Sequence, residues 1–354
     1  MSAKPVVFVG LSGGVDSSVA ALRLQRSGYS VVGVFIKVWH PEWLVCNWEQ
    51  ERLDAMRVAA HLNIPFMTCD AESAYKQGVA DYFIAEYIAG RTPNPDVMCN
   101  QHVKFGAFHN FAREHGAAFI ATGHYAQIEK DNNRVELLRG VDTEKDQSYF
   151  LWTLTQEQLS QVMLPVGNST KSVIREVAQS AGLPTAIKKD SQGVCFLGHI
   201  DIPEFLSHYT SLVPGAVLNK QGEQIGTHVG ALVYTVGQRH GFTAHTHSTL
   251  SEPHYVVERD LVANTITVGT ERPTLTAGKQ LLLTECNWID GMPLPGNHLQ
   301  AQIRYRQTPF LVRITECTNT SATVVPDSAG DLPSAGQSCV LYDGMRCIGG
   351  GIIA

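Results

Sequence analysis

The chain has 354 residues, of which 44% are hydrophobic and 17% charged, and its 27 Lys and Arg residues against 33 Asp and Glu residues give a net charge of −6. This length predicts two or three domains whose cores need no disulfides to hold them together. The acidic balance argues against a protein that coats nucleic acid regardless of sequence, although it leaves room for a local basic face.

The first residues and the cysteines indicate where the protein works. The apolar run after Pro5 is too short for a signal peptide, and no run approaches the roughly 18 residues of a membrane span. The 8 cysteines are scattered and form no CxxC pair, so we interpret them as reduced thiols rather than as a disulfide framework. We therefore expect a cytoplasmic protein that contacts no membrane.

In the first half of the chain, short apolar runs alternate with helical patterns. The runs predicted as buried strands are Val6–Leu11, Val31–Val38, Ile64–Cys69 and Ala117–Thr122. The helices predicted between them lie around Val15–Leu22, around Leu53–Ala60, over Tyr75–Ala89 and over His102–Glu114. Strands that alternate with helices predict parallel βαβ units, and hence an α/β fold with a doubly wound parallel sheet.

After about residue 200, short β-rich runs separated by turn residues predict a different architecture. Two hairpins are predicted, Val217–Leu218 with Gln224–Thr227 and His254–Glu258 with Thr265–Val268. Further strands are predicted at Leu281–Trp288, Leu299–Arg304, Leu311–Thr315, Ala322–Val325 and Ser338–Tyr342. We therefore divide the chain into an α/β domain over 1–200, a small β-rich central domain over 201–272 and a C-terminal β-barrel over 273–354.

The first predicted strand leads into its helix through a glycine-rich loop, Gly10-Leu11-Ser12-Gly13-Gly14-Val15-Asp16-Ser17. Backbone N–H groups of such a loop converge at the helix N-terminus and favour an anion. The loop has neither the Gly-Lys-Ser/Thr of a Walker A loop nor the GxGxxG spacing. The alternative is an ordinary glycine turn in which Asp16 caps the helix. The register of strand, glycines and helix favours a phosphate site.

The order Ser-Gly-Gly-x-Asp-Ser resembles the pyrophosphate loop of the ATP pyrophosphatase superfamily. This resemblance implies that ATP is cleaved between its α and β phosphates. It also implies that an oxygen atom is adenylated, so that a nucleophile can then displace AMP. The loop alone does not decide whether that nucleophile is nitrogen or sulfur.

Two cysteines have surroundings that suit a sulfur nucleophile. Cys99 is predicted in a proline-containing turn just before the helix over His102–Glu114, where the helix dipole stabilises a thiolate. Asp96 precedes it closely and could shuttle a proton. Cys195 follows a polar loop and precedes an apolar stretch. Cys46 is left undecided, and the other cysteines are interpreted as small buried hydrophobic residues.

Several stretches, taken together, resemble one family. They are Gly10–Ser17, Phe35–Lys37, Thr92–Asn100, Ala121–Tyr125, Asp142–Leu151, Asp190–Phe196, Tyr234–Gly241 and Ile303–Arg306. By their order and spacing the chain is similar, over essentially its full length, to the tRNA-specific 2-thiouridylase (MnmA) family. The resemblance implies an N-terminal catalytic domain of the adenine-nucleotide α-hydrolase type, also called the pyrophosphate-loop type.

The resemblance also implies a role for each matching residue. Gly10–Ser17, Ile36 and Gly123 would contact ATP. Cys195 would accept a persulfide sulfur, and Cys99 would act as nucleophile and acid–base partner, closing a disulfide with Cys195 as sulfur is delivered. The residues implied for the target uracil are Asn94, Pro95 and Asp96. Those implied for the rest of the tRNA are His124, Lys145, Asp146, Gln147, Arg304, Tyr305 and Gln337.

The reaction implied is ATP-dependent 2-thiolation of the wobble uridine of tRNA, with release of AMP and pyrophosphate. ATP is expected with Mg²⁺, and no tightly bound metal or Fe–S cluster is expected. The partners implied are tRNA and an upstream persulfide donor, either a relay protein or a cysteine desulfurase, and the family suggests a monomer. Tyr125 and Tyr305 are predicted as stacking surfaces for a base taken out of the anticodon stack.

The sequence also allows other interpretations. A tRNA lysidine synthetase or another pyrophosphate-loop ligase would explain the loop but would leave Cys99 and Cys195 without roles. A catalytically idle tRNA-binding module would keep the scaffold without the chemistry. His245 and His247 resemble a metal cluster by composition only, and a solvated loop is the interpretation that their spacing favours.

Overall fold

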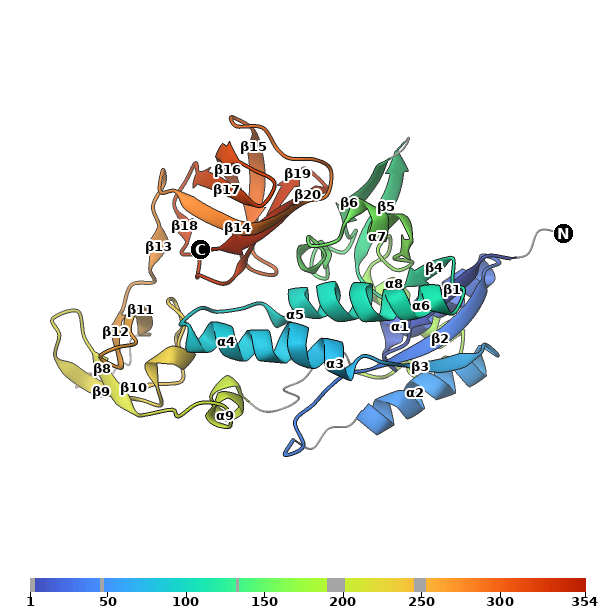
Figure 1. Ribbon diagram of the computed structural model, residues 1–354, viewed down its shortest axis with the longest axis horizontal. Coiled ribbons are helices and arrows are strands. Elements are labelled where there is room, and N and C mark those ends of the chain that lie inside the picture. Colours follow the sequence, from blue (N-terminus) through green and yellow to red (C-terminus); the bar gives the residue numbers. More distant parts are fainter. Residues whose placement is uncertain (1–3, 45–47, 132–133, 190–200, 245–252) are drawn as a thin grey trace.

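The structure is a computed structural model that describes residues 4–44, 48–131, 134–189, 201–244 and 253–354 (Figure 1). It contains one parallel sheet, followed in the chain by a small sheet and a barrel whose strands are mainly antiparallel. Among the helices of the described residues, none is both long enough and apolar enough to span a membrane.

The parallel sheet lies at the core of the first half of the chain. In spatial order its strands are β3 (Phe66–Asp70), β2 (Ser30–Lys37), β1 (Val6–Gly10), β4 (Phe119–Ala121) and β7 (Val162–Met163), and each neighbouring pair is parallel. One face packs against the helices α1 (Val15–Arg26), α2 (Trp48–His61) and α8 (Lys171–Ser180). Because side chains alternate along a strand, Val7 and Val9 join this face and Phe8 joins the other. Helices on both faces confirm the predicted doubly wound sheet.

Two long helices cover the other face of the sheet. The first consists of α3 (Glu72–Tyr75), a π-helical segment (Lys76–Asp81) and α4 (Tyr82–Ile88), and the second of α5 (Pro95–Met98), a π-helical segment (Cys99–Ala107) and α6 (Phe108–Glu114). They run side by side (Figure 1). A Cβ atom at Gly78 would lie 2.7 Å from Cγ of His102, so only glycine allows the two π-helical segments to approach this closely.

The central region forms a small sheet of its own. Its strands in spatial order are β10 (Thr243–Ala244), β9 (Gln224–His228), β8 (Gly215–Leu218), β12 (Thr265–Gly269) and β11 (Tyr255–Asp260). Both predicted hairpins, β8 with β9 and β11 with β12, are antiparallel pairs and are confirmed. A parallel pairing between β8 and β12 joins the two hairpins into one sheet.

The last third of the chain closes into a barrel, as predicted. Its strands in spatial order are β14 (Leu281–Trp288), β17 (Ser321–Pro326), β16 (Phe310–Cys317), β15 (His298–Gln302), β19 (Ser338–Asp343) and β20 (Arg346–Ile353), and the pairing of β14 with β20 completes the circuit. The closing strand β20 was not predicted, because three consecutive glycines are typical of a break in a strand. In the barrel they permit close approach, since a Cβ atom at Gly350 would lie 2.5 Å from the carbonyl oxygen of Cys339.

A hairpin from the first half of the chain extends the barrel sheet. It consists of β5 (Ala126–Asp131) and β6 (Arg134–Arg139), and β6 pairs with β20 through Leu138 and Arg346. The backbone N–H of Arg139 donates to the carbonyl oxygen of Met345 over 2.8 Å. The first and last thirds of the chain therefore share a sheet.

The smaller elements connect these units. They are α7 (Gln156–Ser160), α9 (Ile202–Ser207), β13 (Thr274–Leu275) and β18 (Gly330–Asp331), with 3₁₀ turns at Ser148–Phe150 and Ala231–Val233.

Candidate active site

The glycine-rich loop lies where β1 ends at Gly10 and α1 begins at Val15. Gly14 occupies the N-cap position of α1, so Asp16 lies inside the first turn and is not the cap. Gly13 has a φ of +68°, and a Cβ atom there would lie 2.7 Å from the carbonyl oxygen of Glu51 in α2. The turn therefore requires glycine for two reasons, its left-handed backbone and the close approach of α2.

A cation and a phenol are held at the first turn of α1. The ammonium group of Lys171, the first residue of α8, lies 2.8 Å from each carboxylate oxygen of Asp16. The hydroxyl of Tyr125 donates to Oδ1 of Asp16 over 2.7 Å. Tyr125 is buried, so the prediction that its ring is a stacking surface for RNA is wrong. Tyr125 instead supports the glycine-rich loop, because its ring is buried behind the loop and its hydroxyl holds Asp16.

Ile36 and Gly123 flank the loop on the two neighbouring strands. A Cβ atom at Gly10 would lie 3.5 Å from Cδ1 of Ile36, so this side chain borders the start of the loop. A Cβ atom at Gly123 would lie 2.6 Å from the backbone nitrogen of Ser17. The structure thus brings together the residues predicted for ATP. Leu11 and Val15 are buried. The backbone N–H of Leu11 donates to the carbonyl oxygen of Val34 over 2.8 Å, so Leu11 joins the loop to β2, and Val15 can offer a phosphate its backbone N–H.

This assembly lies at the carboxyl ends of the parallel strands, the edge where open α/β sheets bind ligands. Lys171 was not predicted, because β7 has only two residues and α8 carries no motif of its own. Its position at the start of the helix that follows a sheet strand is the signal that could have identified it. With Lys171 included, the loop combines backbone N–H groups, hydroxyl groups and a cation, which is the donor set that a triphosphate requires.

The second half of the site is the helix that carries Cys99. Oδ1 of Asn94 accepts a hydrogen bond from the backbone N–H of Val97 over 3.3 Å, and Pro95 stands at the first helical position. These two residues start the helix at Pro95 rather than at His102. The predicted turn around Cys99 is therefore wrong, and Cys99 is the first residue of a π-helical segment inside a continuous helix.

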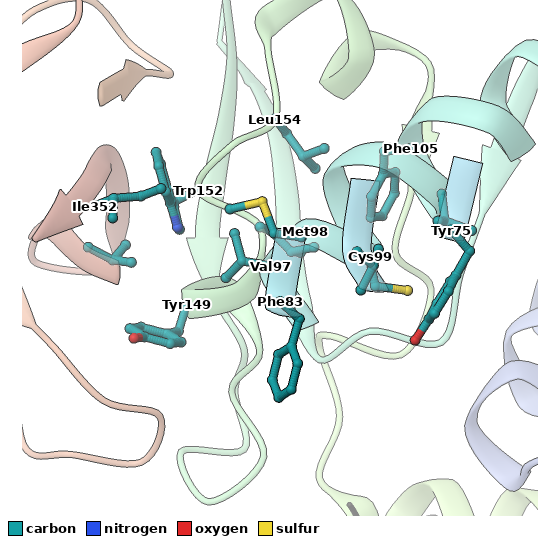
Figure 2. Packing of buried hydrophobic residues seen from close by; sticks show 14 of the residues in the cluster. Tyr75, Phe83, Val97, Met98, Cys99, Phe105, Tyr149, Trp152, Leu154 and Ile352 are labelled. Carbon is teal, nitrogen blue, oxygen red and sulfur yellow. The ribbon is translucent and has the colours of Figure 1, made fainter. Parts of the chain in front are cut away.

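Cys99 is buried in the main apolar cluster. Only 5% of its surface is exposed, and Figure 2 shows it in the same cluster as Tyr75 and Phe105. A π-helical segment widens the helix locally and is frequent at functional sites. Cys195, which is predicted to pair with Cys99, lies outside the described residues, as do Cys46, His245 and His247.

Asp96 stands in the first turn of the Cys99 helix, where its environment changes its acidity. Burial raises the pKa of this carboxyl group above its ordinary value, and the positive charge of Lys104 offsets part of that rise. The raised pKa extends the pH range over which Asp96 holds a proton, and its role in proton transfer stays a prediction.

The raised pKa of Asp96 predicts a pH-dependent effect on stability. The folded state binds this proton more tightly than the unfolded state, so its contribution to the free energy of unfolding is complete below the ordinary value of 3.8 and is lost as the pH rises through the folded-state value. Asn does not titrate, so we expect Asp96→Asn to match the wild type at about pH 4 and to be more stable at neutral pH. Thermal unfolding at both pH values measures the difference.

The control for this prediction is Glu271→Gln. The side chain of Glu271 is 86% exposed, so its replacement should not change the dependence of stability on pH. A difference between wild type and Asp96→Asn that is the same at both pH values would contradict the burial of this carboxylate.

Several residues predicted for tRNA contact are engaged within the protein. Nδ1 of His124 lies 2.7 Å from the hydroxyl of Thr122, and burial together with Lys104 holds the pKa of this histidine well below its ordinary value. Asp146 accepts from the backbone N–H groups of Gly140 and Ser148, and Gln147 accepts from that of Tyr125. Lys145 is half-buried beside them. The role in tRNA binding stays a prediction for each of these residues.

Arg304 and Tyr305 line a pocket of about 440 Å³ on the barrel. The guanidinium of Arg306 lies 5.1 Å from the centre of the Tyr305 ring, whose other neighbour is the Phe150 ring at 4.6 Å. Gln337, by contrast, donates from Nε2 to the carbonyl oxygens of Thr92 and Pro93. The pocket lining holds two arginines, the aromatic rings of Tyr305 and Phe310 and one carboxylate, Asp331. Bases stack on rings and phosphates pair with arginine, so the pocket suits a nucleotide whose phosphate lies on the arginine side.

Among the residues that the structure describes, no group of three or more His, Cys, Asp or Glu side chains is arranged to hold a metal ion.

Comparison with known proteins matches the chain in three consecutive parts. Family models match as a tRNA methyl transferase HUP domain over residues 5–199, a tRNA methyl transferase PRC-barrel domain over 203–270 and an aminomethyltransferase beta-barrel domain over 278–353. Among solved structures, a 4-thiouridine synthetase–RNA complex with bound ATP is 18% identical, with a TM-score of 0.35 over 58% of this chain and 49% of that chain.

Full-length relatives give the stronger likeness. The tRNA-specific 2-thiouridylase MnmA of Lacticaseibacillus paracasei is 44% identical over 98% of this chain and 93% of its own length. The proteins of the same name from Enterococcus faecalis and Bacillus subtilis are 44% and 42% identical, over 99% and 98% of this chain and 96% and 94% of their own lengths. The chain therefore belongs to the tRNA-specific 2-thiouridylase (MnmA) family.

Proposed function

We propose that the protein is a tRNA-uridine 2-sulfurtransferase, which replaces the C2 oxygen of the wobble uridine, position 34 of tRNA, by sulfur at the expense of ATP. The observation that carries the proposal is the combination of a pyrophosphate loop and a capped cysteine helix in a chain that is 44% identical to a named 2-thiouridylase along its length.

The loop and Lys171 would perform the first half of the reaction. Backbone N–H groups at the start of α1 and the ammonium of Lys171 would hold the triphosphate. Attack of the uracil C2 oxygen on the α-phosphorus forms the adenylated base and releases pyrophosphate. The C2 oxygen is a poor leaving group, and adenylation allows it to depart as part of AMP.

Cys195 and Cys99 would perform the second half. The terminal sulfur of a Cys195 persulfide attacks C2, and AMP leaves with the former C2 oxygen. The Cys99 thiolate then attacks the Cys195 sulfur, which breaks the bond to the transferred sulfur and leaves 2-thiouridine and a Cys99–Cys195 disulfide. A thiol reductant restores both cysteines. Sulfur suits both steps because thiolates and persulfides are strong nucleophiles at neutral pH.

Asn94, Pro95 and Asp96 would meet the uracil at the start of the Cys99 helix. The base must leave the anticodon stack to reach them. The raised pKa of the half-buried Asp96 favours its protonated form over a wider pH range, and in that form the carboxyl group would donate a hydrogen bond to the base.

Partners and cofactors complete the proposal. ATP would act with Mg²⁺, without a tightly bound metal or Fe–S cluster. Sulfur would come from a relay protein or a cysteine desulfurase, and the protein would act as a cytoplasmic monomer. The division into domains at 200 and 272 is part of the same proposal.

Two other functions compete with this one. A lysidine synthetase-like ligase would use the loop but not the cysteines, and a catalytically idle tRNA-binding module would use neither. Methyl transfer, which two of the matching family models name, would leave both the pyrophosphate loop and Cys99 without a task.

The test is a thiolation assay with purified protein, unmodified tRNA, Mg-ATP and a persulfide donor, followed by mass spectrometry of the digested nucleosides. We expect 2-thiouridine only when ATP is present. AMP release that depends on tRNA but yields no thiouridine would favour a ligase with another nucleophile. If neither 2-thiouridine nor AMP forms, only the catalytically idle binding module remains.

A further inference from the structure

The loop of residues 90–93 joins the two long helices and leads directly into Asn94, the cap of the Cys99 helix. It is contacted from two sides by parts of the chain that are far away in sequence. We call these residues, Gly90 to Pro93, the hinge loop.

The central sheet holds the hinge loop through Arg259 of β11. One nitrogen of its guanidinium, Nη1, donates to the carbonyl oxygen of Tyr234 over 2.6 Å, and the other, Nη2, donates to the carbonyl oxygen of Gly90. This carbonyl lies just beyond the end of α4, where a cation is favoured by the helix dipole. The hydroxyl groups of Thr235 and Thr92 lie 2.9 Å apart and add a second link.

The barrel holds the same loop from its other side. The backbone N–H of Thr92 donates to the carbonyl oxygen of Ala335 over 2.8 Å. Nε2 of Gln337 donates to the carbonyl oxygens of Thr92, over 2.9 Å, and of Pro93, over 3.4 Å. The residue before the helix cap is thus tied to the barrel by a side chain.

Two glycines allow both units to lie directly on the loop backbone. Gly90 has a φ of +76°, and a Cβ atom there would lie 2.3 Å from Cδ1 of Leu261. Gly336 has a φ of +88°, and a Cβ atom there would lie 3.0 Å from the backbone nitrogen of Thr92. On the barrel side the close atoms belong to the backbone of Thr92, so Gly336 leaves no room for a side chain. On the other side Gly90 meets the end of the Leu261 side chain, and its left-handed backbone is what favours glycine.

We propose that the central sheet and the barrel set the position of Cys99 by holding the hinge loop, with Arg259 and Gln337 as the positioning residues. The helix from Pro95 to Glu114 is continuous, so a shift of its first turn moves Asp96 and Cys99 with it. The effect on sulfur transfer rests on the proposed function, whereas the effect on the accessibility of Cys99 does not.

The test compares Arg259→Met with a matched control, Lys220→Met. Both variants remove a cation from the central sheet, but Lys220 forms only an exposed ion pair with Glu271, 3.4 Å away. Alkylation of Cys99 by iodoacetamide, followed by peptide mass spectrometry without tRNA, reports how often the helix opens. Cys69, which is buried in β3 of the same domain, is the internal reference thiol.

We expect Arg259→Met to raise the alkylation rate of Cys99 relative to Cys69 by about tenfold, as loss of one charge-assisted hydrogen bond implies. We also expect kcat for thiolation to fall about tenfold with the KM for ATP unchanged, because a small misplacement of a reacting group is costly. Lys220→Met should behave like the wild type. Arg259→Lys keeps the charge but presents its donors from a single nitrogen atom instead of the two that Arg259 uses, so its alkylation rate and kcat should lie between those of the wild type and Arg259→Met.

Gln337→Met separates positioning from a direct role in tRNA binding. If Gln337 holds the hinge loop, its loss accelerates Cys99 alkylation in the absence of tRNA. A residue that acts only on tRNA would leave that rate unchanged, and this result would remove Gln337 from the proposal.

Two results would overturn the proposal as a whole. One is a Cys99 to Cys69 ratio that Arg259→Met leaves unchanged. The other is an equal rise at both cysteines, which would mean general loosening of the domain. If Arg259→Met does not fold, the ratio of the Cys99 and Cys69 alkylation rates in Arg259→Lys tests the proposal instead. A wild type without thiolation activity would refute the proposed function, while the alkylation ratio would still decide on the hinge loop.

Discussion

The Cys99→Ser protein should bind ATP and adenylate tRNA but form no 2-thiouridine. A serine hydroxyl is a far weaker nucleophile than a thiolate and cannot form the disulfide that releases the transferred sulfur. We expect thiouridine formation to fall by on the order of 10³-fold or more. AMP release dependent on tRNA should persist at one equivalent per protein molecule, because in the proposed reaction the Cys195 persulfide displaces AMP before Cys99 acts. Nucleoside mass spectrometry and AMP chromatography on one reaction measure both halves.

The matched control is Cys317→Ser. Cys317 is partly exposed on the barrel strand β16, far along the chain from the cysteine helix, so thiouridine formation should not change. Thermal unfolding checks that Cys99→Ser retains its fold despite a hydroxyl in a buried position. Thiouridine formed at the wild-type rate by Cys99→Ser would refute the two-cysteine reaction.

The Gly123→Ala protein should lose ATP binding and, with it, both halves of the reaction. The added Cβ would lie 2.6 Å from the backbone nitrogen of Ser17 and 2.8 Å from the carbonyl carbon of Asp16. Backbone atoms cannot turn aside as a flexible side chain can, so the first turn of α1 must move away from β4. A displacement of this kind should lower AMP release by on the order of 10²-fold. Titration calorimetry with ATP measures the loss of binding.

Gly330→Ala provides the comparison, because a Cβ atom at Gly330 would meet no neighbouring atom within 4 Å. The same chemical change should there leave ATP affinity and AMP release unaltered. Wild-type affinity for ATP in Gly123→Ala would show that the loop is not where the nucleotide binds.

The sequence predicted the parts of this protein in which a local pattern decides the structure. Strands β1 to β4 are buried apolar runs, and β8 with β9 and β11 with β12 are hairpins around polar turns, so neighbouring residues suffice to identify them. The phosphate loop was identified for the same reason, because its glycines and the helix after them are adjacent in the chain.

Long-range contacts account for what the sequence did not predict. Lys171 meets Asp16 across 155 positions of the chain, and although Asp16 belongs to the glycine-rich loop, no local pattern marks Lys171. The ring of Tyr125 is buried in an apolar cluster that only the fold assembles, and its hydroxyl there reaches Asp16. The early start of the Cys99 helix is different, since the cap Asn94 followed by Pro95 was a local signal that outweighs the turn preference of the surrounding prolines.

The pairing of β6 with β20 has a consequence for folding during synthesis on the ribosome, because the two strands are made at different times. The edge of β6 that receives β20 is made early, whereas its partner strand, Arg346–Ile353, belongs to the last third of the chain. At roughly 5–20 residues per second, that edge waits on the order of ten seconds or more before its partner is synthesised. An open strand edge invites pairing with other chains during such a wait. Conditions that slow elongation between β6 and β20 should therefore reduce the yield of folded protein more than the same delay before β6 is made.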